Sequence, residues 1–142
     1  MDITLKLDPD EADERVVLDG LREYNKQAGG PTGYQPIAIL LHDEAGKAVG
    51  GLTGQTIYGW LFIKLLHIPD AYRGRGFGTQ LMERAEVFAR ERGLTGIWLD
   101  TFDFQARPFY EKLGYAVFGT IDDHPVGGAR YFLQKRLDGA ST

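Results

Sequence analysis

Apolar and polar positions alternate in two distinct ways along the first quarter of the chain. Residues 3–7 alternate isoleucine or leucine with threonine or lysine, which predicts an edge strand. The segment Asp8-Pro9-Asp10 ends this strand and can cap a helix. Apolar side chains then recur at helical spacing over residues 11–28, until Gly29-Gly30-Pro31 stops the pattern. We therefore predict a strand, a helix and a loop before residue 35.

Three short apolar runs separated by turn residues come next. They cover residues 37–42, 48–57 and 60–68, with turns at 43–47 and 58–59. Strands joined by such short loops pair in the antiparallel sense, so these runs predict a meander. The middle run contains Gly50, Gly51 and Gly54, which indicates a bulge or a close backbone approach.

After Pro69 helical and strand patterns alternate. The first helix begins near Thr79 and ends at Gly93, with Glu86 and Arg90 off its apolar face as a favourable i,i+4 pair. A short second helix lies between about residue 105 and Gly114, and a proline at 108 makes it start late. The remaining strands cover residues 97–101, 115–119 and 131–137.

A helix connects the strands 60–68 and 97–101, so these two should run parallel. Trp60 and Trp98 lie in these strands and are expected in the core. The predicted fold class is α/β (α+β), with one mixed, mostly antiparallel twisted sheet flanked by helices. At 142 residues the chain fits a single domain over 1–142.

Composition narrows the functional classes. Cysteine is absent, which removes a disulfide framework, a thiolate metal site and a cysteine nucleophile, and we expect no metal. The N-terminus does not resemble a signal peptide, and the longest apolar run is interrupted by Lys64, so a cytoplasmic protein with no membrane segment is expected. The net charge of −4 disfavours nucleic acid and suits a cationic substrate such as an amine.

A glycine-rich run at the predicted strand-to-helix junction carries the strongest chemical signal. The run is Arg73-Gly74-Arg75-Gly76-Phe77-Gly78, and Thr79 opens the helix. Glycines leave the backbone amides unobstructed, the helix N-terminus adds a positive dipole end, and arginines can pair with phosphate oxygens. The backbone amides of residues 73–79 therefore predict a site for a phosphate-bearing ligand.

Two common phosphate sites do not fit this run. A P-loop would need a lysine after its last glycine, and none is present. The dinucleotide fingerprint matches at Gly74-x-Gly76 and has an acidic Asp100 downstream, but its third glycine is replaced by Thr79. The run also follows an antiparallel stretch, and about 65 residues downstream are too few for a second half-fold.

The same residues resemble the acetyl-CoA signature of the GCN5-related N-acetyltransferases, as Arg73-x-x-Gly76-x-Gly78. A second segment, Gln105-Ala106-Arg107-Pro108-Phe109-Tyr110-Glu111-Lys112-Leu113-Gly114-Tyr115, is similar to the family's Asn-x-x-Ala-x-x-Phe-Tyr-x-x-x-Gly-Phe. Gln105 stands nearer the start of the short helix than the family's asparagine. The order of strands and helices agrees from about residue 37 onward.

The resemblance implies that acetyl-CoA is bound as co-substrate on residues of both segments. The expected cofactor-binding residues are Leu66, His67, Ile68, Arg73, Gly74, Arg75, Gly76, Phe77, Gly78, Thr79, Gln105 and Phe109. Residues 73–79 would hold the pyrophosphate, with the two arginines either on phosphates or in solvent. Residues 66–68 would run beside the pantetheine arm where the two parallel strands splay apart, and the Ile68 N–H would stabilise the oxyanion.

Tyr110 is the catalytic residue that the resemblance implies, because its hydroxyl would lie near the sulfur. A tyrosine is a weak acid suited to protonating a departing thiolate. Phe109 then serves mainly in packing. The base that deprotonates the amine stays open among His67, Asp100, Glu44, His124 and water.

The resemblance thus implies an N-acetyltransferase that moves acetyl to a primary amine directly in a ternary complex, since no cysteine can carry an acyl group. The acceptor is a small-molecule or peptide amine, and a homodimer is possible. Two rival interpretations stay open: a non-catalytic acyl-CoA-binding module, and a structural domain without the cofactor.

Overall fold

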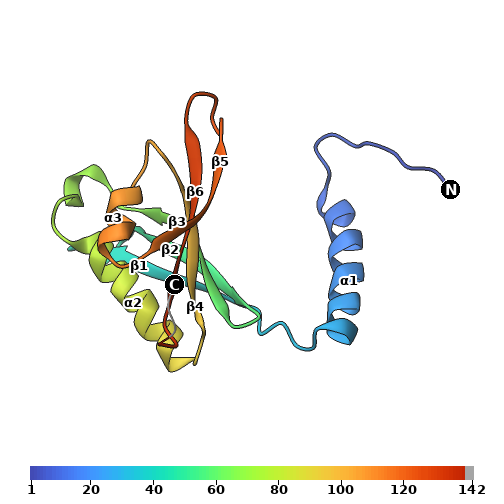
Figure 1. Cartoon of the computed structure of the whole chain (residues 1–142), viewed down its shortest axis with the longest axis horizontal. Coiled ribbons are helices and arrows are strands. Elements are labelled where there is room, and N and C mark those ends of the chain that lie inside the picture. The colour runs from blue at the N-terminus through green and yellow to red at the C-terminus, as the bar shows by residue number, and fades with distance from the viewer. Residues whose placement is uncertain (140–142) are drawn as a thin grey trace. The chain divides into compact units, whose positions relative to one another are not determined.

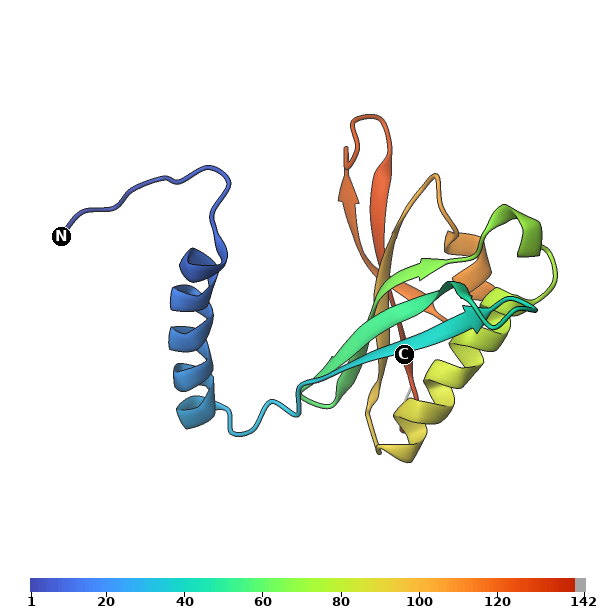
Figure 2. The same cartoon turned by 180° about the vertical axis from the view of Figure 1, so that it is seen from behind.

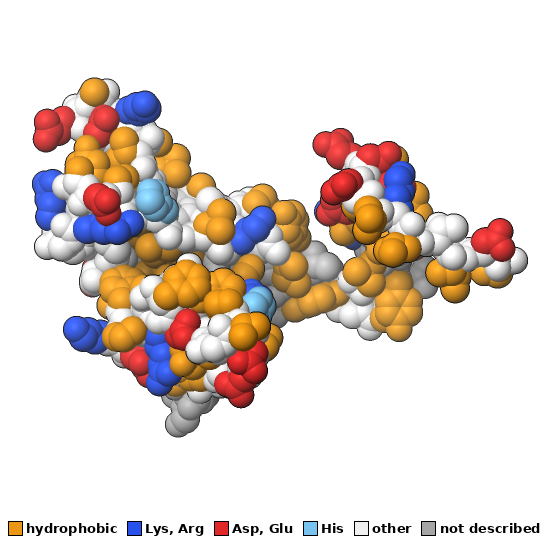
Figure 3. Space-filling view, turned by 90° about the horizontal axis from the view of Figure 1, so that it is seen from above, with side chains coloured by type: hydrophobic (Ala, Val, Ile, Leu, Met, Phe, Trp, Pro, Cys, Tyr) orange, Lys and Arg blue, Asp and Glu red, His pale blue; other side chains and the backbone are white. Residues whose placement is uncertain are grey.

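The computed structural model describes residues 1–139 and separates into two units, Met1–Thr32 and Gly33–Thr142. The first unit contains helix α1, Glu11–Ala28, as predicted. Asp10 caps it in a capping box: the Asp13 N–H donates to Asp10 Oδ1 and the Asp10 N–H donates to Asp13 Oδ2, both at 2.9 Å. The helix carries exposed hydrophobic side chains beside its acidic ones (Figure 3).

The strand expected over residues 3–7 does not form, and this prediction was wrong. Its alternating side chains are all exposed, including Ile3 and Leu5. Alternation describes only which faces side chains occupy, whereas a strand also needs a neighbour for its backbone hydrogen bonds. All six strands of the sheet come from the second unit.

Over residues 33–139 the second unit consists of one sheet with two α-helices and a short 3-10 helix. The strands are β1 (Gln35–His42), β2 (Ala48–Ile57), β3 (Trp60–His67), β4 (Gly96–Phe102), β5 (Ala116–Asp122) and β6 (Ala129–Arg136). The helices are η1 (Asp70–Tyr72), α2 (Phe77–Glu91) and α3 (Arg107–Lys112). The strand order is β1-β2-β3-β4-β6-β5, and among these six described strands only β3 and β4 pair in parallel. The mixed, mostly antiparallel sheet and the parallel pair are therefore confirmed.

Helices α2 and α3 lie against the same face of the sheet (Figures 1 and 2). The core fills the space between the sheet and these helices. It includes Leu61 and Ile63 of β3, Ile97 and Leu99 of β4, and Met82 of α2. The predicted bulge in β2 is also present, because the register with β3 shifts between residues 53 and 54. In the described part of the chain no helix is long and apolar enough to cross a membrane.

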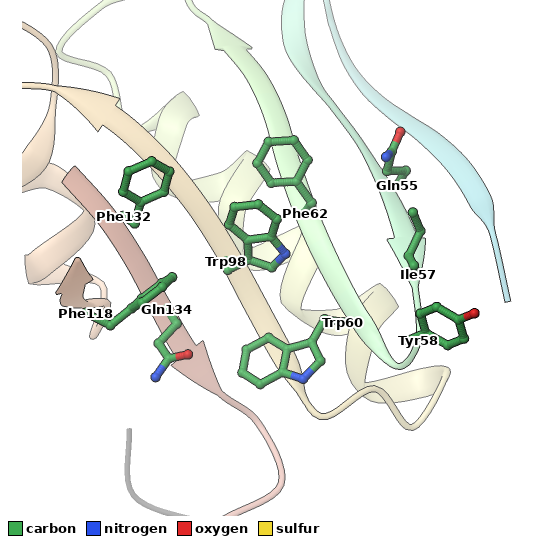
Figure 4. A pocket seen from close by; sticks show the side chains of 9 residues that line it. All are labelled: Gln55, Ile57, Tyr58, Trp60, Phe62, Trp98, Phe118, Phe132 and Gln134. Atoms are coloured by element: carbon green, nitrogen blue, oxygen red, sulfur yellow. The ribbon is translucent and has the colours of Figure 1, made fainter. Parts of the chain in front are cut away.

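The opposite face of the sheet carries aromatic side chains, which line a shallow cavity of about 560 Å³ (Figure 4). Trp60 and Trp98 belong to this face and are only partly buried, so their expected place in the core was wrong. Strands β3 and β4 are apolar on both faces, and alternation alone does not say which face the helices cover.

Glu86 was also misplaced, since it is 7% exposed rather than on the solvent side of α2. It accepts hydrogen bonds from the Tyr115 hydroxyl at 3.3 Å and from Lys135 Nζ at 2.9 Å, and Arg90 lies 3.6 Å away. The expected pair with Arg90 exists, but as the outer part of a buried network. Burial and the Glu86 carboxylate raise the pKa of Tyr115 strongly.

Candidate active site

Strands β3 and β4 diverge at their carboxyl ends, and a cleft of about 1060 Å³ opens there. Their pairing runs from Trp60 opposite Gly96 only as far as Ile63 opposite Leu99. Beyond that point β3 continues beside β2 to His67, and β4 continues beside β6. The predicted splay between the two parallel strands is therefore present, and both walls of the cleft are held by their outer neighbours.

Tyr110 and every residue predicted to bind the cofactor line this cleft, except Arg75. One set follows β3 and enters α2, and the other follows β4 and enters α3. Two segments that lie about thirty residues apart in sequence are thus brought to one site. This is what binding of one ligand by both segments requires.

The amino end of α2 presents unpaired backbone donors to the cleft. The helix begins at Phe77, two residues earlier than predicted, because Gly76 takes a left-handed conformation at the N-cap with φ of +81°. No side chain in the described part of the chain caps this end, and the first helical hydrogen bond is donated by the Gln80 N–H to the Gly76 carbonyl. The amides of residues 77–79 therefore keep their hydrogen-bonding capacity for a ligand.

The three glycines of the run 73–78 serve different purposes. Gly74 and Gly76 have φ of +73° and +81°, and a Cβ built on either meets no atom within 4 Å. They provide left-handed turns whose outer side is open to a ligand. A Cβ on Gly78 would instead lie 3.1 Å from Cζ of Phe109. Gly78 thus allows α3 to approach α2, which gives Phe109 the packing role that was predicted for it.

The two arginines also differ. Arg73 donates from Nε to the Ile68 carbonyl at 2.8 Å and pairs with Asp70 at 2.7 Å, so it fastens the loop to the end of β3. Arg75 lies over the rings of Tyr72 and Phe77, 5.8 and 5.2 Å from their centroids, and does not line the cleft. Of the two alternatives predicted for this arginine, a position in solvent therefore describes Arg75 better than a contact with phosphate does.

Tyr110 reaches the cleft from α3 and is 7% exposed. Its ring packs edge-on against Phe109 and Tyr115, with centroids 5.0 and 6.2 Å apart. Burial first and the charge of Asp100 second raise the pKa of its hydroxyl above the ordinary value of about 10. A raised pKa keeps the phenol protonated at neutral pH, which is the state that a proton donor needs.

Gln105 fixes the backbone that follows β4. Its Oε1 accepts from the Phe102 N–H at 2.8 Å and from the Thr101 hydroxyl at 3.2 Å. This side-chain carbonyl closes the turn before α3, and Pro108 in the first turn of α3 accounts for its late start at Arg107, as predicted.

The four side chains considered as bases occupy different surroundings. Asp100 lines the cleft but is paired with Arg130 at 2.9 Å, and His67 lines it on an exposed stretch of β3. Glu44 lies in the β1–β2 turn and does not line the cleft. His124 stands edge-on to the ring of Phe102, 5.2 Å between centroids, at the β5–β6 turn.

Sequence reasoning missed part of the cleft wall after β4. Phe102 and Phe104 both line it, as do Thr101 and Ala106. The signal available for the two rings was a pair of phenylalanines spaced by one residue at a strand end, where the chain turns polar.

In the described residues no group of three or more metal-ligating side chains is present.

Comparison with known proteins agrees with this geometry. The family profile described as "Acetyltransferase (GNAT) family" matches residues 5–115. Acetyltransferase Atu2258 of Agrobacterium fabrum is 33% identical over 124 residues, 87% of this chain and 90% of its own. Blasticidin-S acetyltransferase of Streptomyces morookaense is 41% identical over 95 residues, which are 66% of this chain and 70% of that protein.

A crystal structure of a protein from Agrobacterium tumefaciens, assigned as an acetyltransferase, has a TM-score of 0.91 at 32% identity. It covers 96% of this chain and 99% of its own. The chain therefore belongs to the GNAT family of acetyltransferases, and it is an acyltransferase enzyme. The family resemblance and the fold class are confirmed.

Proposed function

We propose that the cleft between β3 and β4 binds acetyl-CoA and that the enzyme transfers the acetyl group to the primary amine of a small molecule. The observation that carries this proposal is the joint placement of the open amides of residues 77–79 and the buried Tyr110 on one cleft. The amides suit a pyrophosphate, and the cleft leads from them to a neutral phenol.

The residues of the cleft fit acetyl-CoA in their chemistry. The open space beside Gly74 and Gly76 is where phosphate oxygens would approach the backbone. The end of β3 at residues 66–68, which has lost its pairing with β4, offers backbone groups to an extended pantetheine arm. A strand edge without a neighbour binds extended ligands through its main chain.

The chemistry assigned to the chain is direct transfer. The amine nitrogen attacks the thioester carbonyl carbon, and the Ile68 N–H stabilises the negative charge that develops on the carbonyl oxygen. The C–S bond then breaks, and Tyr110 gives its proton to the departing thiolate. The ammonium proton leaves to water or to His67, because Asp100 is held by Arg130.

The relative from Streptomyces morookaense is named for the acetylation of blasticidin S, which supports a small-molecule acceptor. The test is release of free thiol from acetyl-CoA in the presence of a library of primary amines, with mass spectrometry of the products. We expect thiol release in equal amount to an N-acetylated amine. Binding of acetyl-CoA without acetylation of any amine would contradict the proposed reaction.

A further inference from the structure

Phe104 is a large aromatic side chain that the fold leaves in solvent. It lies in the turn between β4 and α3, lines the cleft, and is 70% exposed. Its ring stacks on Phe102 with the centroids 5.4 Å apart and the planes inclined by only 4°. Stacking uses one face of the Phe104 ring, so most of the rest remains available. We call the two rings the aromatic shelf.

The shelf is fixed without any contribution from the Phe104 ring. The Asp103 N–H donates to the Ala129 carbonyl at 2.9 Å, and the Gln105 N–H donates to the Phe102 carbonyl at 3.0 Å. These backbone bonds shape the turn whatever side chain stands at position 104. The exposed ring therefore does little for folding, and exposed aromatic rings on a rigid frame are typical of binding sites.

Phe102 is held from its other sides. The His124 ring stands edge-on to it at 5.2 Å, and the Arg130 guanidinium lies 5.6 Å from its centroid while pairing with Asp100. The inner ring of the shelf is thus locked by neighbours from the β5–β6 turn and from β6. A locked inner ring keeps the outer ring in one orientation, which lowers the entropy cost of stacking a ligand on it.

The place of the shelf in the cleft indicates which ligand it meets. The glycine loop that suits the pyrophosphate follows β3, whereas the shelf lies at the end of β4 on the other wall, with its rings two and four residues along the chain from Asp100. We propose that the aromatic shelf binds a flat ring of the acceptor amine and so makes the enzyme selective for acceptors that carry one. This inference rests on the proposed function, because it takes the glycine loop as the coenzyme A site.

The test compares two amines of equal length and carbon number that differ in ring shape. 2-Phenylethylamine has a planar ring and 2-cyclohexylethylamine a puckered one. Each is titrated by NMR into the protein saturated with unacetylated coenzyme A, so that no reaction occurs. We expect the planar amine to bind roughly two- to tenfold more tightly, the range that aromatic stacking provides beyond area burial.

Phe104→Leu should remove this preference and leave the melting temperature and coenzyme A affinity unchanged. The matched control is Phe118→Leu, which removes an exposed ring on the sheet face away from α2 and α3 and should keep the preference. Equal affinity of the two amines for the unaltered protein, no binding of either, or a preference that survives Phe104→Leu would overturn the shelf.

Two further outcomes separate the possible failures. A Phe104→Leu variant with weakened coenzyme A binding would show that the shelf stacks the adenine ring of coenzyme A, which also overturns the inference. A failure of coenzyme A to bind the unaltered protein would contradict the proposed function itself, and the initial titration with coenzyme A reads this directly.

Discussion

Replacing Tyr110 by phenylalanine removes one oxygen atom from the cleft and little else. The ring is 7% exposed and packs against Phe109 and Tyr115, contacts that phenylalanine preserves. Burial first and Asp100 second raise the pKa of the hydroxyl, and no group within residues 1–139 forms a hydrogen bond with it. Deleting this oxygen therefore orphans no partner, and we expect the melting temperature to stay nearly unchanged.

The effect on turnover should be large. A positioned proton donor contributes typically about 10²–10⁴-fold, so Tyr110→Phe should lower kcat by about that factor. This corresponds to roughly 3–5 kcal/mol of transition-state free energy. The affinity for acetyl-CoA should change little, because the hydroxyl acts on the sulfur only as the C–S bond breaks.

The pH dependence gives a second readout of the same residue. The folded-state pKa of Tyr110 is raised, so the phenol stays protonated up to and beyond the ordinary value of about 10. Ionisation of Tyr110 should therefore cause no loss of kcat between pH 7 and pH 10. A decline in this range that disappears in Tyr110→Phe would refute the raised pKa.

The assay is thiol release under saturating acetyl-CoA, with calorimetry for binding. Tyr115→Phe is the matched control, since the neighbouring tyrosine donates to Glu86 instead of lining the cleft. It should lose about 1.5–3 kcal/mol of stability with the loss of a hydrogen bond to a charged group, and keep its turnover. Unchanged kcat in Tyr110→Phe would remove the acid role from this residue.

Three other predictions concern the loop, the buried network and assembly. Gly76→Ala and Gly93→Ala both place an alanine at positive φ in open space, so each should lower the free energy of unfolding by about 1–2 kcal/mol. Calorimetry should show weaker coenzyme A binding for Gly76→Ala only. Equal coenzyme A affinities of the two variants would contradict the pyrophosphate assignment. Lys135→Met leaves the buried Glu86 carboxylate without its 2.9 Å partner and should cost about 3 kcal/mol in denaturant unfolding, with partial recovery on adding Glu86→Gln. A loss below 1 kcal/mol would show that Arg90 and the Tyr115 hydroxyl suffice to hold the carboxylate. The possible homodimer stays a prediction, and sedimentation of a single monomeric species would contradict it.

Local signals predicted most of the second unit. The short loops between β1, β2 and β3 left antiparallel pairing as the natural arrangement, and the helix after β3 required a parallel neighbour. No such signal predicted that β6 lies between β4 and β5. Strands β5 and β6 form a hairpin and are neighbours whichever of the two pairs with β4. Only the register of β6 with both neighbours decides it.

The site was predictable where chemistry depends on the backbone. The glycines at 74 and 76 predicted unobstructed amides at a helix start, and the structure gives both glycines a left-handed conformation at the start of α2. The roles of Arg73 and Gly78 depend on contacts that the motif does not specify. Arg73 donates to the Ile68 carbonyl, and Gly78 packs against Phe109. Glu86 was misjudged because its charge suggested solvent, whereas Lys135, about fifty residues away, compensates it inside the fold.

The central claim is that the open amides at the start of α2 hold a diphosphate and thereby direct an acetyl thioester to Tyr110. Calorimetric titration of the protein with acetyl-CoA and with S-acetylpantetheine, which has the same thioester but no diphosphate, tests it most directly. We expect acetyl-CoA to bind one molecule per chain and S-acetylpantetheine to bind at least a hundredfold more weakly. Equal affinity for the two compounds, or no heat of binding with acetyl-CoA, would contradict the assignment.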